Sequence, residues 1–152
     1  MNNPKDIYKE RVISILTNFQ ILEMSLKIYI GKSYELIQHI VVDRVYFDFS
    51  ASDVENYPLE KLLNLFGKLN GNEELKKRLN KLRSHRNYVA HQALLLSLPK
   101  NENTDEFHEK ARDFFYLEEE IMKCLIELAD EGGELLNNFK GGNAQKPPTA
   151  RS

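Results

Sequence analysis

The sequence predicts an all-α protein, an antiparallel bundle of four to five helices. Glycine and proline are scarce through the first 130 residues, and the apolar residues recur at spacings of three and four. Long amphipathic helices joined by short connections are typical of helical bundles. Helices that pack face to face in this way also offer a flat outer stripe to a second copy of the chain.

Length and composition indicate one domain, residues 1–140, followed by a flexible tail, residues 141–152. Hydrophobic residues make up 41% and charged residues 29%, as in an ordinary soluble protein. No apolar run approaches membrane-spanning length, and the polar start does not resemble a secretory signal. Cys124 is the only cysteine, so an internal disulfide and a cysteine-based metal cluster are excluded. We expect a cytoplasmic protein with no membrane partner.

The first helix is expected to begin at Asn3 or Pro4, because proline is favoured in a first helical turn. Gly31 interrupts its pattern, and the segment that follows either continues the helix or starts a second one. The predicted core stripe of this helix contains Val12, Ile15, Phe19, Leu22, Leu26 and Tyr29.

Residues 43–57 are expected to form a loop with an extended piece at 45–49, where β-branched and aromatic residues cluster. A short helix follows, with Pro58 in its first turn. Asn72, after a turn signal, can cap the next helix, which should end at about Leu98.

The last long helix should run from about Asp105 to Asp130, with Thr104 as its cap. Two glycines at 132 and 133 are expected to break this helix.

The third helix carries a charge in its core seam. A heptad layout places Arg86 among apolar seam residues, which are Leu75, Leu79, Leu82, Val89, Ala93 and Leu96. A guanidinium keeps its charge, so Arg86 needs a carboxylate, a phosphate or a route to water. Glu23, at the edge of the first helix's stripe, is the expected partner. The pair either serves structure alone or orients Arg86 toward a phosphate.

A polar ridge lies on another face of the same helix. Arg83, Asn87 and His91 follow one another at spacings of four, beside the small Ala90. An imidazole can exchange protons at neutral pH, and a nearby fixed cation can stabilise charge that develops on a phosphodiester. The ordinary alternative is an exposed histidine on a charged helix.

The hexapeptide RNYVAH, Arg86 to His91, resembles the R-x4-H signature of the HEPN superfamily. The run into it, YPLEKLLNLFGKL and then ELKKRLNKLRSH, resembles that of abortive-infection-type HEPN proteins, and the likeness covers roughly residues 5–130. The resemblance implies a helical bundle that forms a two-fold homodimer. It also implies that motifs from both copies build one metal-independent RNase site without a cofactor. Such proteins often act as toxins or in phage defence, with a cognate antitoxin or defence-system partner.

The resemblance also implies catalytic roles. Arg86 would bind and polarise the scissile phosphate. His91 would act as base on the ribose 2′-OH or as acid to the leaving 5′-oxygen, and Asn87 would orient His91 or contact the phosphate. Some toxin members carry a tyrosine two residues after the histidine, which a partner nucleotidyltransferase modifies. Here that position is Ala93, so regulation of this kind is not expected.

The segment 76–86 carries six Lys or Arg residues and no acid. It would steer RNA toward the cleft, with Arg83 and Glu23 in supporting roles. The expected RNA-binding residues are Lys76, Lys77, Arg78 and Lys81. The alternative is that basic and acidic helices simply lie side by side.

Two other functions stay open. The first is a non-catalytic HEPN-like module that binds a partner protein or a nucleotide. The second, weaker one is a metal-binding bundle, for which Glu35 with His39 and Asp105 with His108 each supply only half a site.

Overall fold

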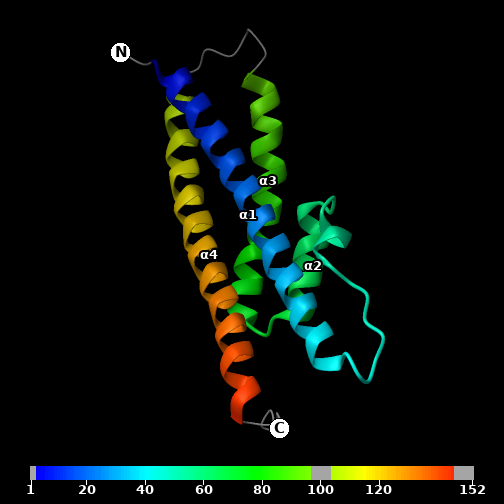
Figure 1. The fold of residues 1–152 in the computed structure, drawn as a ribbon. Helices are drawn as coiled ribbons and strands as arrows, with labels where there is room; N and C mark the ends of the chain where they lie inside the picture. The colour runs from blue at the N-terminus through cyan, green and yellow to red at the C-terminus, as the bar shows by residue number, and fades with distance from the viewer. Residues whose placement is uncertain (1–2, 97–103, 146–152) are drawn as a thin grey trace.

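The computed structural model describes residues 3–96 and 104–145, and the side chains of 4, 94–96, 104–108 and 138–145 are not described. The elements are α1 (Pro4–Val41), the 3-10 helix η1 (Ala51–Val54), α2 (Leu59–Leu69), α3 (Glu73–Leu96) and α4 (Thr104–Gln145) (Figure 1). Within these described ranges there is no strand. The all-α prediction is therefore confirmed.

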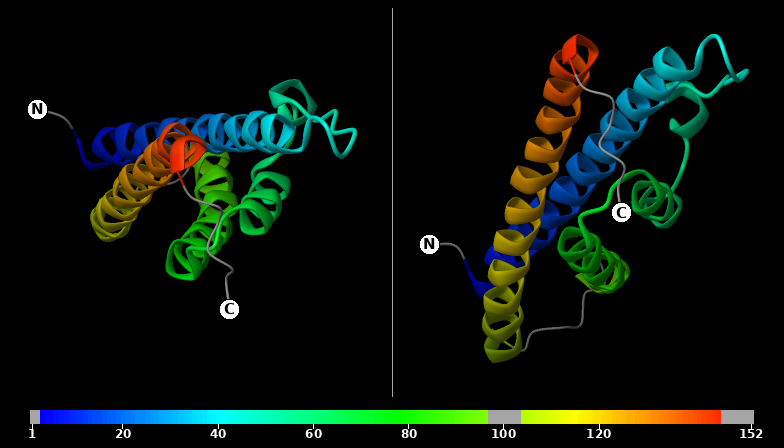
Figure 2. Two further views of the ribbon diagram at one scale, coloured as in Figure 1. Left: turned by 60° about the horizontal axis from the view of Figure 1, so that its bottom comes forward. Right: turned by 90° about the horizontal axis from the view of Figure 1, so that it is seen from below.

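The helices are not all antiparallel to one another. α3 runs against α1 and against α4, whereas α1 and α4 run the same way (Figure 1). Because α3 runs in the opposite direction to both of its long neighbours, α1 and α4 are parallel to each other. α2, α3 and α4 all lie on one side of α1, as the left view of Figure 2 shows. The opposite side of α1 is therefore left uncovered by these helices, and of the described elements only η1 packs on α1 there, near Gly31.

α1 is one continuous helix of 38 residues. The Asn3 side chain accepts a hydrogen bond from the Asp6 N–H at 3.0 Å and so caps it. Gly31 does not interrupt the helix. A Cβ at Gly31 would lie 2.8 Å from the Cβ of Ala51, so glycine allows η1 to pack directly on α1. All six predicted stripe residues of this helix are buried.

The segment between α1 and α2 holds an aromatic cluster. The expected extended piece at 45–49 does not form a strand. Instead, Phe47 packs edge-on against Tyr34 with ring centroids 5.9 Å apart, and Phe49 lies 5.2 Å from Phe47. These ring contacts hold the loop against the end of α1.

The caps of α2 and α3 follow their sequence signals closely. Pro58 is the N-cap residue of α2 and thus lies just before its first turn. The Asn72 side chain accepts from the Leu75 N–H at 3.1 Å, which confirms the predicted cap of α3. The predicted end of α3 at Leu98 lies outside the described residues.

α4 continues through Gly132 and Gly133 to Gln145, so the predicted break is wrong. None of the described glycines has a positive φ, and Gly132 and Gly133 lie inside the helix with helical residues on either side. Each glycine costs a helix about 1 kcal/mol relative to alanine, which packing along α1 can offset. α4 thereby enters the segment expected to be a tail from residue 141.

Candidate functional site

Arg86 and Glu23 form the predicted ion pair between α3 and α1. Nη2 of Arg86 lies 3.5 Å from Oε1 of Glu23. The seam neighbours Leu82 and Val89 are buried, which fixes the backbone on either side of Arg86. The Arg86 side chain nevertheless stays 43% exposed, against 20% for Glu23. Arg86 is thus a cation that a carboxylate holds from one side and solvent reaches from another.

The polar ridge is only partly open. Asn87 and His91 are exposed, whereas Arg83 is half-buried and its Nη1 lies 3.4 Å from Oε1 of Glu60 on α2. Ala90 is half-buried beside them. The structure therefore leaves Asn87 and His91 open to a ligand, whereas Arg83, with its side chain 42% exposed, pairs with Glu60 at the surface.

Arg86 and His91 point in different directions within one chain. Residues five apart on an α-helix are separated by about 140° around the axis and about 7.5 Å along it. A phosphate bound at Arg86 is therefore not automatically within reach of the same chain's His91. A second copy that faces this helix could supply the missing group.

The end of α3 that carries His91 is held by a buried amide. Gln92 is buried, and its Oε1 accepts from the Tyr8 hydroxyl at 3.2 Å and from Lys110 Nζ at 3.1 Å. These contacts join α1, α3 and α4 next to the motif. Sequence analysis missed Gln92, although it lies three residues after the seam residue Val89 and is the only amide on that edge of the seam.

Two of the four expected RNA-binding residues serve the fold. Lys76 Nζ donates to the carbonyl oxygens of Gly67 at 3.0 Å and Asn70 at 3.2 Å, and it pairs with Glu73. These contacts close the turn between α2 and α3.

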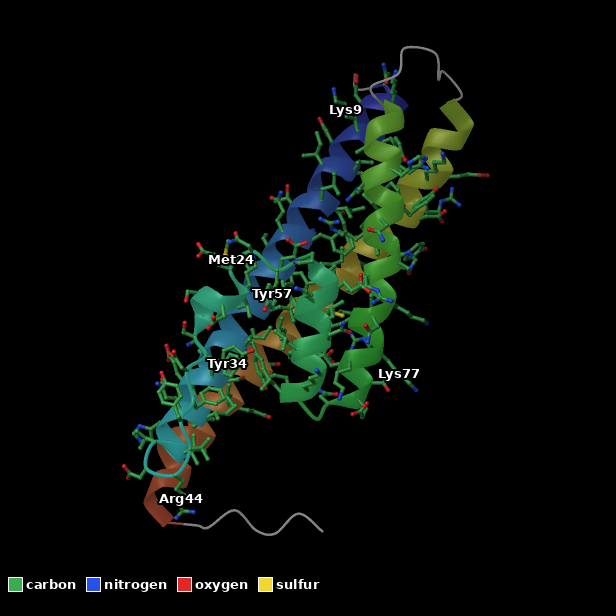
Figure 3. The ribbon with its side chains drawn as sticks, turned by 90° about the vertical axis from the view of Figure 1, so that its right-hand side faces the viewer. Lys9, Met24, Tyr34, Arg44, Tyr57 and Lys77 are labelled. Atoms are coloured by element: carbon green, nitrogen blue, oxygen red, sulfur yellow. The ribbon has the colours of Figure 1, made fainter. Side chains whose placement is uncertain are left out.

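Arg78 joins α3 to the acidic face of α4. Its Nε lies 2.8 Å from Oε1 of Glu120, and its Nη1 binds Glu127. The side-by-side interpretation of the charged helices is therefore right for Arg78. Lys77 and Lys81 are exposed, and Figure 3 shows Lys77 projecting from the outer edge of α3. Of the four expected RNA-binding residues, Lys77 and Lys81 are therefore the two that stay open to solvent.

Cys124 is fully buried, as predicted for a core residue. Burial raises the pKa of its thiol to about 11, although the Arg78 guanidinium acts in the opposite direction. The thiol is therefore protonated at neutral pH and unsuited to a nucleophilic role.

The other candidate residues, His85 and the two half metal sites, are not gathered into a site within the described part of the chain. His85 is exposed, and so are Glu35 and His39. The side chains of Asp105 and His108 lie outside the described part of the chain. Among the residues whose side chains are described, no three His, Cys, Asp or Glu side chains gather as metal ligands. In the same part of the chain, no helix has the length and apolarity to cross a membrane.

Comparison of the chain with protein-family models, with curated proteins and with solved structures finds no match. The HEPN resemblance therefore depends on the RNYVAH hexapeptide, its helical context and Glu23.

Proposed function

We propose that the protein is a metal-independent HEPN-type endoribonuclease that acts as a two-fold dimer. The observation that carries the proposal is the Arg86 guanidinium, which Glu23 holds at 3.5 Å while the side chain stays 43% exposed. Arg86 lies between the buried seam residues Leu82 and Val89, and its exposed guanidinium leaves room for a phosphate to bind beside Glu23. The exposed Asn87 and His91 on the same helix supply the polar and titratable groups that RNA cleavage needs.

The proposed reaction is transesterification within RNA. His91 takes the proton from the ribose 2′-OH, the 2′-oxygen attacks phosphorus, and the bond from phosphorus to the 5′-oxygen breaks. Arg86 binds a non-bridging oxygen, where negative charge develops. The leaving 5′-oxygen takes a proton from a histidine, so the products end in a 2′,3′-cyclic phosphate and a 5′-hydroxyl. Asn87, one turn before His91, orients the imidazole or contacts the phosphate.

The divergence of Arg86 and His91 on one helix favours a composite site. A two-fold axis close to α3 would bring the His91 of one copy to the Arg86 of the other. Lys77 and Lys81, which are exposed on the preceding turns, then extend the positive surface along the RNA backbone. A toxin or phage-defence role follows from the same resemblance and is part of the proposal.

The test is cleavage of a mixed RNA pool by the purified chain in EDTA. Arg86→Ala and His91→Ala should each lower the cleavage rate by at least about 100-fold, because each removes one partner of the proton transfer or charge stabilisation. His85→Ala is the matched control, since His85 is an exposed histidine on the same helix outside the motif.

Two results would overturn the proposal. A folded parent that cleaves no RNA across a varied pool would favour the non-catalytic module, and so would equal rates for the parent and His91→Ala. In cells, the parent should slow host growth and His91→Ala should not.

A further inference from the structure

The face of α1 that points away from the other helices lacks charge. Between residues 13 and 28, every exposed residue is uncharged, and the two charged residues of the stretch, Glu23 and Lys27, are half-buried, although 29% of the whole chain is charged. Charged residues return immediately outside this stretch, with Lys9 and Glu10 before it and Glu35 after it. The exposed residues of the stretch are Ile13, Ser14, Thr17, Gln20, Ile21, Met24 and Ile28.

α4 adds exposed apolar residues beside this surface, together with the charged Glu119 and Lys123. Phe115, Met122 and Ile126 are exposed at spacings of seven and four, so they lie on one side of α4. A shallow groove between the two helices joins the surfaces. Ser14 and Asn18 line its α1 wall, and its α4 wall is formed by Phe115, Glu118, Glu119, Met122 and Lys123. We call the large apolar members of this surface the outer apolar face: Ile13, Ile21, Met24, Ile28, Phe115, Met122 and Ile126.

The size of the outer apolar face is that of a protein interface. Its seven residues are 44% to 61% exposed. With roughly 200 Å² for a fully exposed residue of this size, they present on the order of 700 Å², close to the ~800 Å² that each partner buries in a standard interface. A contiguous exposed apolar patch larger than a few hundred Å² is rare on a monomer and marks an interaction site.

We propose that the outer apolar face binds the same face of a second copy of this chain through a two-fold axis. A surface without charged residues offers no electrostatic complementarity to RNA or to an oppositely charged protein. In a two-fold dimer the same surface of two copies meets, and when that surface is uncharged no like charges are brought together. Glu119 and Lys123, which line the groove beside Met122, carry opposite signs and can pair across the axis. The exposed side of α1 between residues 13 and 28 is depleted in charge, as the centre of a protein interface is.

This interface is separate from the composite nuclease site. Met24 and Lys77 project from opposite sides of the molecule (Figure 3), so a copy on α1 leaves α3 open. The inference therefore does not depend on the proposed ribonuclease activity. If both two-fold contacts form, the chain builds a tetramer or a larger assembly.

The experiment is the molar mass of the full 152-residue chain at micromolar concentration, by light scattering after size exclusion. Ile28→Arg should raise the dissociation constant of this contact by at least about tenfold and lower the mass by half. Val45→Arg is the matched control, because Val45 is 58% exposed and Ile28 53%, but Val45 lies in the loop after α1. This control should keep the parental mass.

A monomeric parent would overturn the inference, and so would a parental mass that Ile28→Arg leaves unchanged. Circular dichroism checks the fold of each variant, and Met24→Lys replaces Ile28→Arg should that variant fail to fold. RNA cleavage of the same variants is measured in parallel, since loss of the α1 contact should leave the α3 site intact.

Discussion

The same substitution at two helical glycines should change stability in opposite directions. Replacing glycine by alanine inside a helix stabilises it by about 0.5–1 kcal/mol when the new methyl group has room. At Gly133 a Cβ would meet no atom within 4 Å. Gly133→Ala should therefore raise the free energy of unfolding by about 0.5–1 kcal/mol, which for a chain of this size raises Tm by about 1–4 °C.

At Gly31 the methyl group has no room. A Cβ there would lie 2.8 Å from the Cβ of Ala51 and 3.4 Å from its Cα. η1 cannot move away freely, because its Val54 is buried in the same hydrophobic core as Ile30 and Tyr34 of α1. Overpacking of this kind costs about 1–3 kcal/mol, which exceeds the gain in helix propensity. Gly31→Ala should therefore lower the free energy of unfolding by about 0.5–2 kcal/mol.

Urea unfolding followed by circular dichroism measures both effects. The double variant Gly31→Ala with Ala51→Gly removes one of the two colliding methyl groups and should recover most of the loss, a coupling that a double-mutant cycle reports. The reasoning is refuted if Gly31→Ala is as stable as Gly133→Ala, or if the second substitution rescues nothing. A loss of stability in Gly133→Ala would contradict the continuous α4.

Two further predictions concern the contact between α3 and α4. Arg78→Met leaves Glu120 and Glu127 without their guanidinium and should lower the free energy of unfolding in urea by about 1–2 kcal/mol. The control Lys77→Met should change it by less than about 0.5 kcal/mol. Equal effects of the two variants would contradict the assigned role of Arg78. Cys124→Ala should destabilise the protein at pH 7, and this cost should shrink as pH rises from 9 to 11. The buried thiol keeps its proton up to a pKa of about 11, whereas the unfolded thiol ionises near 9.0, so stability tied to the protonated thiol is lost over that range. A cost that stays constant across this pH series would show that burial does not raise the pKa of the Cys124 thiol.

The sequence predicted those features of the fold that depend on residues within one or two turns of a helix. The stripe of α1 and the Asn72 cap follow from spacing and from side-chain chemistry within one turn. The Glu23–Arg86 pair could also be predicted, because a seam arginine must find a carboxylate and the facing helix offers one at the edge of its stripe.

Features that depend on distant packing could not be predicted in this way. Helix propensity argued for a break at Gly132, but α1 supports α4 through that point, and propensity yields to tertiary contacts. Lys76 and Arg78 contact carbonyl oxygens of the turn before α3 and glutamates of α4, and the sequence of one helix does not show such partners. Gln92 also needs partners from two other helices, which no single helix pattern shows.

The chemistry of the RNA ends tests the central claim most directly. The parent chain in EDTA should cut a defined RNA to leave a 2′,3′-cyclic phosphate and a 5′-hydroxyl, and a single 2′-deoxy substitution at the cut should block cleavage there. Uncut RNA, products with 5′-phosphate ends, or cleavage that the 2′-deoxy substitution does not affect would contradict the roles assigned to Arg86 and His91.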